Sequence, residues 1–351
     1  MAFSCSISGG IEALSVLAGI RFDRMFSDVD AIVTAYRNGG KIALEMYGPD
    51  IPFGGPRWAG ISYGHVNCLG SELVFPENSE VAHTPIYDNL ADGIRALERD
   101  VDFTRVGLFP FYLELWEKLK IIFPDCAVPF GGFGAEGPLT TAWLLRGHDF
   151  FMDIYDDPPL AKKYLALVTA SLVKYQKLLA RINGLPEYNP SVAFIADDGA
   201  AMLPPALWPD CVVPFIDGYF TAMTSGNRYA HIEDLSPDHL PFLDTLQVME
   251  FDPSVSRKLS PSSIRAHCRV PFIWRFNEIE GETYSVAQTR HWVFDAAMQG
   301  APAVRTGIWR NNCTFQGRDN TIAFRDAARA VQKLLAAGYP RERLMEKEIT
   351  S

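Results

Sequence analysis

The sequence predicts an α/β fold, in the form of a single (β/α)8 TIM-type barrel with an N-terminal capping segment. From about residue 125 onward, short apolar runs alternate with longer segments of helical spacing, which is the pattern of parallel strands joined by crossover helices. Several of these runs are almost continuously apolar, as strands buried on both faces are. The number of such units in a chain of 351 residues favours a closed barrel over a small open sheet.

The apolar runs are short and end in polar turns, which fixes the predicted strands. They cover residues 127–134, 191–198, 228–234, 246–252, 269–277 and 303–309. Helices are predicted between and after them at residues 159–182, 285–300 and 322–338. The last of these ends at Gly338, a residue type that commonly caps the C-terminus of a helix.

One domain is expected to span residues 1–351. Residues 1–100 are rich in glycine and proline and less regular than the rest, so they are assigned to the N-terminal cap and the first barrel units. Low-complexity tracts and long linkers are missing from the sequence, so nothing in it divides the chain further.

Composition narrows the class of protein. The formal net charge of -10 argues against a nucleic acid as partner, because such binding needs clustered lysine and arginine. No run approaches the ~18 apolar residues of a membrane-spanning helix, and the first residues lack the pattern of a signal peptide. The six cysteines are scattered without close pairs, which favours free thiols and a cytoplasmic location. A small-molecule substrate and a protein partner fit these features.

Acidic side chains follow several of the predicted strands, at the barrel end where such folds carry their chemistry. Asp198, Glu250 and Glu278 are therefore candidate catalytic residues. Asp198 would orient a ligand or bind substrate, whereas Glu250 and Glu278 would support the metal ligands from behind or replace a missing ligand. The alternative is that each acid only caps the helix that follows it.

Basic side chains near the same ends are candidates for substrate binding. Arg275 and Arg310 are suited to pair with a substrate carboxylate, although they would equally form ion pairs with the rim acids. His65, in the segment SYGHVNC, is a candidate for the pocket wall, with a purely structural role as the alternative.

The best candidate metal site combines His231, Glu233 and Cys313. Residues two apart on a strand point to the same face, so His231 and Glu233 share a face and Asp234 turns away. Cys313 lies in the loop after the last predicted strand. Imidazole, carboxylate and thiolate all bind zinc, and three protein ligands leave a fourth position for substrate. The alternatives are a hydrogen-bonded core histidine and a buried, inert cysteine.

Three segments have a recognisable pattern, namely residues 68–86, 137–179 and 194–220, the last with a strand, Asp-Asp-Gly, a proline-containing turn and a helix. In these segments the sequence resembles the uroporphyrinogen decarboxylase superfamily. The resemblance extends over roughly residues 60–340, and it implies a (β/α)8 barrel.

Two chemistries occur in that superfamily. Its decarboxylases hold porphyrinogen carboxylates with an N-terminal arginine motif, whereas this chain offers only Arg21 and Arg24, outside that motif. Its corrinoid-linked methyltransferases, similar to the coenzyme M methyltransferases, bind zinc through His-x-Cys and a later Cys. His231 and Cys313 match two of these positions, and Glu233 stands in the place of the middle cysteine.

The resemblance therefore implies a zinc-dependent methyltransferase that acts on a small methylated substrate. No corrinoid-binding segment of the Asp-x-His-x-x-Gly type occurs in the sequence, so the corrinoid (cobalamin) is expected on a partner protein. A carboxylate in place of a thiolate makes the zinc a stronger Lewis acid, which favours an oxygen-methylated substrate such as a methyl ether. The alternatives are a decarboxylase and a barrel that binds a corrinoid protein or a ligand without turnover.

Overall fold

The computed structural model describes residues 3–77 and 80–348, which form a mixed α/β fold. The strands are β1 (Ser4–Gly9), β2 (Leu73–Val74), β3 (Ala82–His83), β4 (Val192–Ala196), β5 (Asn227–His231), β6 (Val248–Asp252), β7 (Ile273–Arg275) and β8 (Ala303–Ile308). The helices of the first half are α1 (Ile11–Leu17), α2 (Val29–Thr34), α3 (Gly40–Tyr47), α4 (Gly64–Cys68), α5 (Leu90–Leu97), α6 (Phe109–Ile122), α7 (Pro138–Arg146), α8 (Asp149–Asp156) and α9 (Pro158–Ile182). Those of the second half are α10 (Trp208–Cys211), α11 (Val213–Met223), α12 (Pro241–Thr245), α13 (Pro261–His267), α14 (Glu278–Gly281), α15 (Val286–Met298) and α16 (Phe315–Ala336).

Six of the strands form two parallel sheets, one in the order β4-β5-β6 and one in the order β1-β8-β7. A single parallel bridge between Phe251 and Phe272 links β6 to the segment that leads into β7. Further single bridges join Gly9 to Phe53 and Ile61 to Phe133. The predicted parallel α/β architecture is confirmed, but the sheets do not close into one continuous barrel among the described residues.

Five predicted strands correspond to β4, β5, β6, β7 and β8. The predicted strand at residues 127–134 is wrong, because this segment forms only the isolated bridge at Phe133. Pro129 lacks a backbone donor and two consecutive glycines follow it, so the segment is poorly suited to a ladder. Strand β1 escaped prediction because its sequence, SCSISG, alternates serine with only two larger apolar residues.

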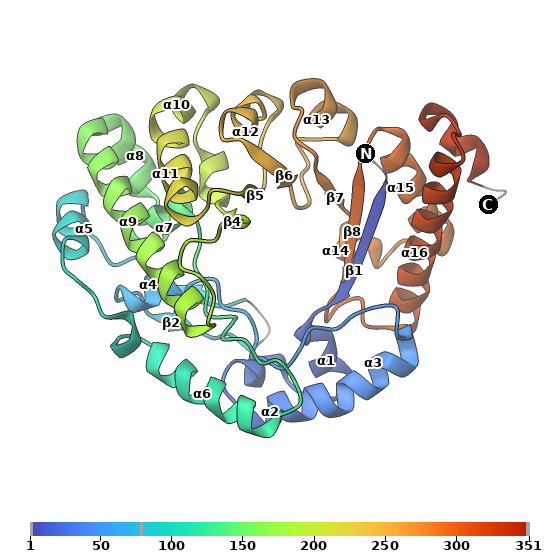
Figure 1. Ribbon diagram of the computed structural model, residues 1–351, viewed down its shortest axis with the longest axis horizontal. Coiled ribbons are helices and arrows are strands. Elements are labelled where there is room, and N and C mark those ends of the chain that lie inside the picture. The colour runs from blue at the N-terminus through green and yellow to red at the C-terminus, as the bar shows by residue number, and fades with distance from the viewer. Residues whose placement is uncertain (1–2, 78–79, 349–351) are drawn as a thin grey trace.

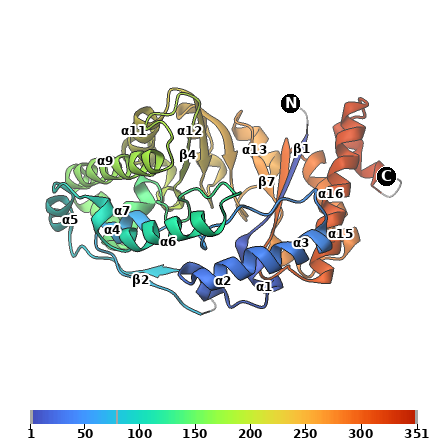
Figure 2. The same cartoon turned by 60° about the horizontal axis from the view of Figure 1, so that its bottom comes forward.

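Helices lie on the outside of the strands, and Figure 1 shows β1 beside β8 although the two are at opposite ends of the chain. Figure 2 shows α1, α2 and α3 together, at the end of β1 away from the N-terminus. The long helix α9 begins at the capping carboxylate of Asp157 and buries Tyr164, Leu165, Val168 and Leu172 in the main core. None of the helices formed by the described residues has both the length and the apolar composition needed to cross a bilayer.

Candidate functional site

The C-terminal ends of β4, β5 and β6 carry the polar groups of the site. The parallel register places Ala196 beside His231, and His231 beside Asp252. Ala230, the residue before His231, is buried in the core against the helices, so the imidazole projects from the opposite face of the strand. Asp198 follows β4 by two residues and begins a short 3-10 helix.

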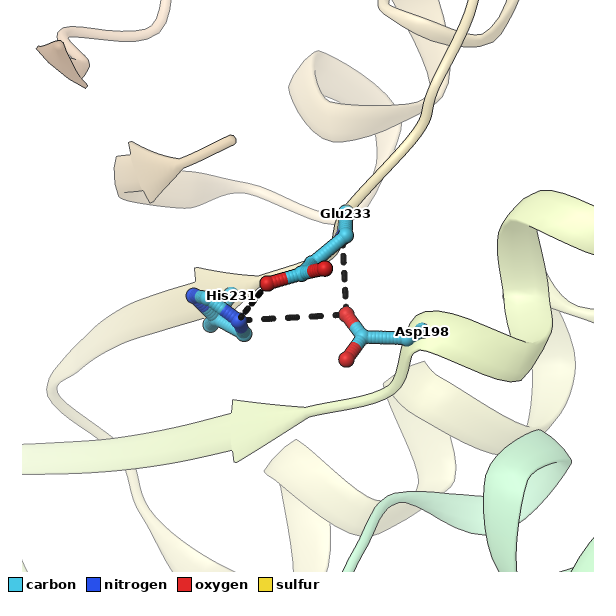
Figure 3. Close-up of side chains that lie close together, drawn as sticks. All are labelled: Asp198, His231 and Glu233. Carbon is cyan, nitrogen blue, oxygen red and sulfur yellow. Dashed lines mark hydrogen bonds and ion pairs between the residues drawn. The ribbon is translucent and has the colours of Figure 1, made fainter. Parts of the chain in front are cut away.

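Three of these side chains form a compact group of possible metal ligands (Figure 3). His231 Nε2 lies 3.5 Å from Glu233 Oε1 and 3.9 Å from Asp198 Oδ1. The backbone N–H of Glu233 also donates to Asp198 Oδ1 at 2.7 Å, which ties the loop after β5 to the loop after β4. The predicted pairing of His231 with Glu233 is therefore present, with Asp198 as a third oxygen donor.

Asp252 holds the other side of the imidazole. Its Oδ2 lies 3.4 Å from His231 Nδ1 and accepts from Arg275 Nη2 at 2.8 Å and from Arg305 Nη1 at 3.2 Å. Its Oδ1 accepts from the backbone N–H of Ser254 at 2.9 Å. With Nδ1 turned toward Asp252, Nε2 is the nitrogen that faces Glu233 and Asp198.

The electrostatics of the group follow from this crowding of carboxylates. Burial by itself would lower the pKa of His231, but Asp252, Glu233 and Asp198 outweigh it and raise the pKa to about 9. The hydrogen bond with His231 lowers the pKa of Glu233, and burial raises that of Asp198. Burial opposes ionisation of Asp252, yet His231 and Arg275 hold its pKa well below the usual range. The group is thus built to stabilise a positive charge.

Cys313 is not brought to this group. Its Sγ lies 3.7 Å from the carbonyl of Ala13 and 3.9 Å from Tyr47 Oη, in a small apolar cluster between α1 and α3. The loop after β8 turns back because Asn312 Oδ1 accepts from the backbone of Trp309. The predicted ligand set with Cys313 is therefore not assembled, and among the described residues Asp198 takes the third place.

Two other predicted site residues lie away from the donor group, and a third has a side chain outside the described residues. His65 is fully buried on α4, where Nε2 pairs with Ser171 Oγ at 2.9 Å and the ring packs against Phe103 and Tyr175, so its predicted place in the pocket wall is wrong. Glu250 lies within β6, two residues before Asp252, and belongs neither to the donor group nor to the cavity wall. The side chain of Glu278 lies outside the described residues.

A cavity of about 680 Å³ borders the donor group through Glu233. Arg275 and Arg310, the two arginines predicted to bind substrate, both line it. Arg275 is already engaged with Asp252 and with Ser254 Oγ at 3.3 Å, so the ion-pair alternative describes it better. Four aromatic residues also line it, namely Phe22, Phe26, Tyr63 and Trp309.

Sequence reasoning assigned no role to Asp252 or to Glu136. Asp252 is the last residue of β6, as His231 is the last residue of β5, and these equivalent positions at neighbouring strand ends could have identified Asp252. Glu136 lies in the irregular segment before α7, where burial raises its pKa to about 7 and Ser62 hydrogen-bonds to it. Its proximity to Asp198 depends on the chain path between residues 133 and 137, which no local pattern encodes.

Comparison with solved structures identifies a fold of the same kind. A methyltransferase from Methanosarcina mazei superposes with a TM-score of 0.66, at 17% sequence identity, with 94% of each chain covered. At this identity the likeness establishes the overall fold. No family model and no curated protein matches the sequence. The resemblance to the uroporphyrinogen decarboxylase superfamily therefore stays a prediction.

Proposed function

We propose that this chain is a zinc-dependent methyltransferase, which moves a methyl group between a small methylated substrate and the corrinoid of a partner protein. The observation that carries the proposal is the group formed by Asp198, His231 and Glu233 at the edge of a cavity. The structural likeness to a methyltransferase over almost the whole chain supports it. The proposal includes a (β/α)8 barrel in which the irregular segments around Phe53, Ile61 and Phe133 complete the ring between β1 and β4.

The donor atoms suit zinc. Zinc bonds of about 2.0–2.2 Å at tetrahedral angles separate neighbouring donors by about 3.3–3.6 Å. The separations of 3.5 Å and 3.9 Å from His231 Nε2 are close to this range. An imidazole and two carboxylates leave one tetrahedral position for substrate. When bound, zinc supplies a Lewis acid, and the corrinoid supplies a cobalt centre able to exchange a methyl group.

The protein's own groups prepare this site. Asp252 holds the Nδ1 side of His231, which keeps Nε2 directed at the donor group, and Arg275 and Arg305 compensate the charge of Asp252. Glu233 connects the donor group to the cavity, so that a substrate atom reaches the site from there. Because two of the three donors are oxygens, the proposed substrate carries its methyl group on oxygen, as a methyl ether does.

The test combines metal analysis with transfer of a methyl group to cob(I)alamin, followed by the change in the corrinoid spectrum. The parent protein should hold zinc and transfer methyl from at least one methyl ether, whereas His231→Ala should lose both properties. Asp217→Asn, on the outer surface at the ion pair with Arg228, is the matched control and should keep both. Full transfer by metal-free protein would refute the proposal.

A further inference from the structure

The cavity has a cationic corner that the donor group does not use. Arg310 lies two residues after β8 and lines the cavity, with its guanidinium carbon 5.7 Å from the centre of the Phe22 ring. Arg275 and Arg305 both pair with Asp252, but no carboxylate of the described residues forms an ion pair with Arg310. A guanidinium that rests on an aromatic ring still donates from its edge to a planar anion.

A flat aromatic surface adjoins this arginine. A Cβ at Gly307 would lie 2.3 Å from Trp309 Nε1, and one at Gly10 would lie 3.1 Å from Trp309 Cε3. The indole therefore rests on bare backbone at Gly10 and Gly307, and residues with side chains would push it away. The hydrogen bond from Trp309 N to Asn312 Oδ1, 2.7 Å long, fixes the turn below it. Trp309 remains 43% exposed as a residue and lines the cavity.

We infer that Trp309, Arg310 and Phe22 form a subsite for the far end of the substrate, and that this end is a planar organic carboxylate such as a carboxylated aromatic ring. The indole offers a face for stacking, and the guanidinium offers paired donors to a carboxylate. The inference rests on the proposed function, because it places the opposite end of the same substrate at the donor group.

Glu12 lines the same wall and is the group that would compete for Arg310. Burial raises the pKa of the Glu12 carboxyl, although Arg57 and Arg310 act in the opposite direction. Among the described residues neither Glu12 nor Glu80, which also lines the cavity, forms an ion pair with Arg310.

The probes are benzoate and benzamide, two planar molecules of similar size that differ in charge. Their dissociation constants are measured by calorimetry on the full chain. The affinity for benzoate should be at least about fivefold higher than that for benzamide, because a charge-assisted hydrogen bond is stronger than a neutral one. Arg310→Gln should remove this preference, and Trp309→Ala should weaken the binding of both ligands. Arg318→Gln is the matched control, because Arg318 also lies over a ring, that of Phe315, but does not line the cavity.

The same measurements in His231→Ala separate this subsite from the donor group, because a carboxylate is also a zinc ligand. A preference for benzoate that persists in His231→Ala supports the subsite even if methyl transfer itself is never observed. Its disappearance in that variant would assign the carboxylate to the metal and overturn the inference. Equal affinity for the two probes in the parent, no binding of either, or an equal loss in Arg318→Gln would overturn it as well.

Discussion

Replacing Asp252 by asparagine isolates the role of the carboxylate behind His231. The change keeps the size of the side chain and removes one oxygen acceptor. If the remaining oxygen stays with the backbone N–H of Ser254, the new amide NH2 group faces the N–H donors of Arg275 and Arg305, which lose the oxygen that accepted from them. The amide N–H also donates to Nδ1 of His231, which moves the imidazole proton to Nε2, the nitrogen that faces the donor group.

The loss in zinc affinity follows from this change of tautomer. Carboxylates that orient metal-binding histidines are typically worth about 10–100-fold in affinity, or roughly 1.4–2.7 kcal/mol. Breaking a fully buried ion pair costs about 3–5 kcal/mol of stability. The arginine side chains here are 25% and 39% exposed, so roughly 2–4 kcal/mol is the more realistic cost.

The assay is a competition titration of zinc against a chromophoric chelator, with thermal unfolding of the metal-free proteins measured in parallel. Asp217→Asn is the control, because it removes an exposed carboxylate from the ion pair with Arg228 at 2.6 Å. The control should change zinc affinity by less than about twofold, as expected for a change that does not touch the donor group. A folded Asp252→Asn protein with the zinc affinity of the parent would refute the positioning role.

Three further outcomes are expected. Cys313→Ser should leave zinc content unchanged because the sulfur packs against Ala13 and Tyr47, and a loss of zinc on elemental analysis would contradict the described position. In the same titration, Asp198→Ala should reduce zinc affinity more than the loss of a residue that only orients a metal ligand does, which is typically about 10–100-fold. An unchanged affinity would exclude Asp198 as a donor. Burial lowers the pKa of His65 from 6.5 to about 3, so the folded state excludes a proton that the unfolded chain accepts. Its stabilising effect is complete above pH 6.5 and falls by about 1.4 kcal/mol per pH unit below it, so denaturant titrations of His65→Gln should show a flatter acid dependence than the parent.

The strands that were predicted correctly carry large or branched apolar residues, such as Ile195, Phe251 and Val304, which pack in the main core. Strand β1 lies at the edge of its sheet, where Ser4, Ser6 and Ser8 occupy one of its faces and only Cys5 and Ile7 pack toward the core. Its pairing with β8 is set by contacts between the two ends of the chain. Local periodicity carries no information about such a partner.

Within the site, the arrangement that could be predicted is the one between residues close together in the sequence. His231 and Glu233 lie two apart at the end of one strand, so the pleat alone brings them to one face. The third donor, Asp198, follows the neighbouring strand β4, and its approach to His231 depends on the register that sets Ala196 beside His231. The position of Cys313 depends on a turn closed by the side chain of Asn312, which directs the chain toward α1. Spacing in the sequence does not specify such a turn.

The exchange of Cys313 for Asp198 preserves the charge of the ligand set while altering its chemistry. A histidine with two thiolates, as the resemblance implies, carries two negative charges, and so does a histidine with two carboxylates. Electrostatic balance with a divalent ion is therefore maintained, whereas electron donation to the metal is weaker because oxygen is the harder ligand. The raised pKa of His231, with three carboxylates around it, reflects the same surplus of negative charge. In the proposed enzyme this negative charge binds the metal. The hard oxygen ligands then favour a substrate whose methyl group is carried on oxygen.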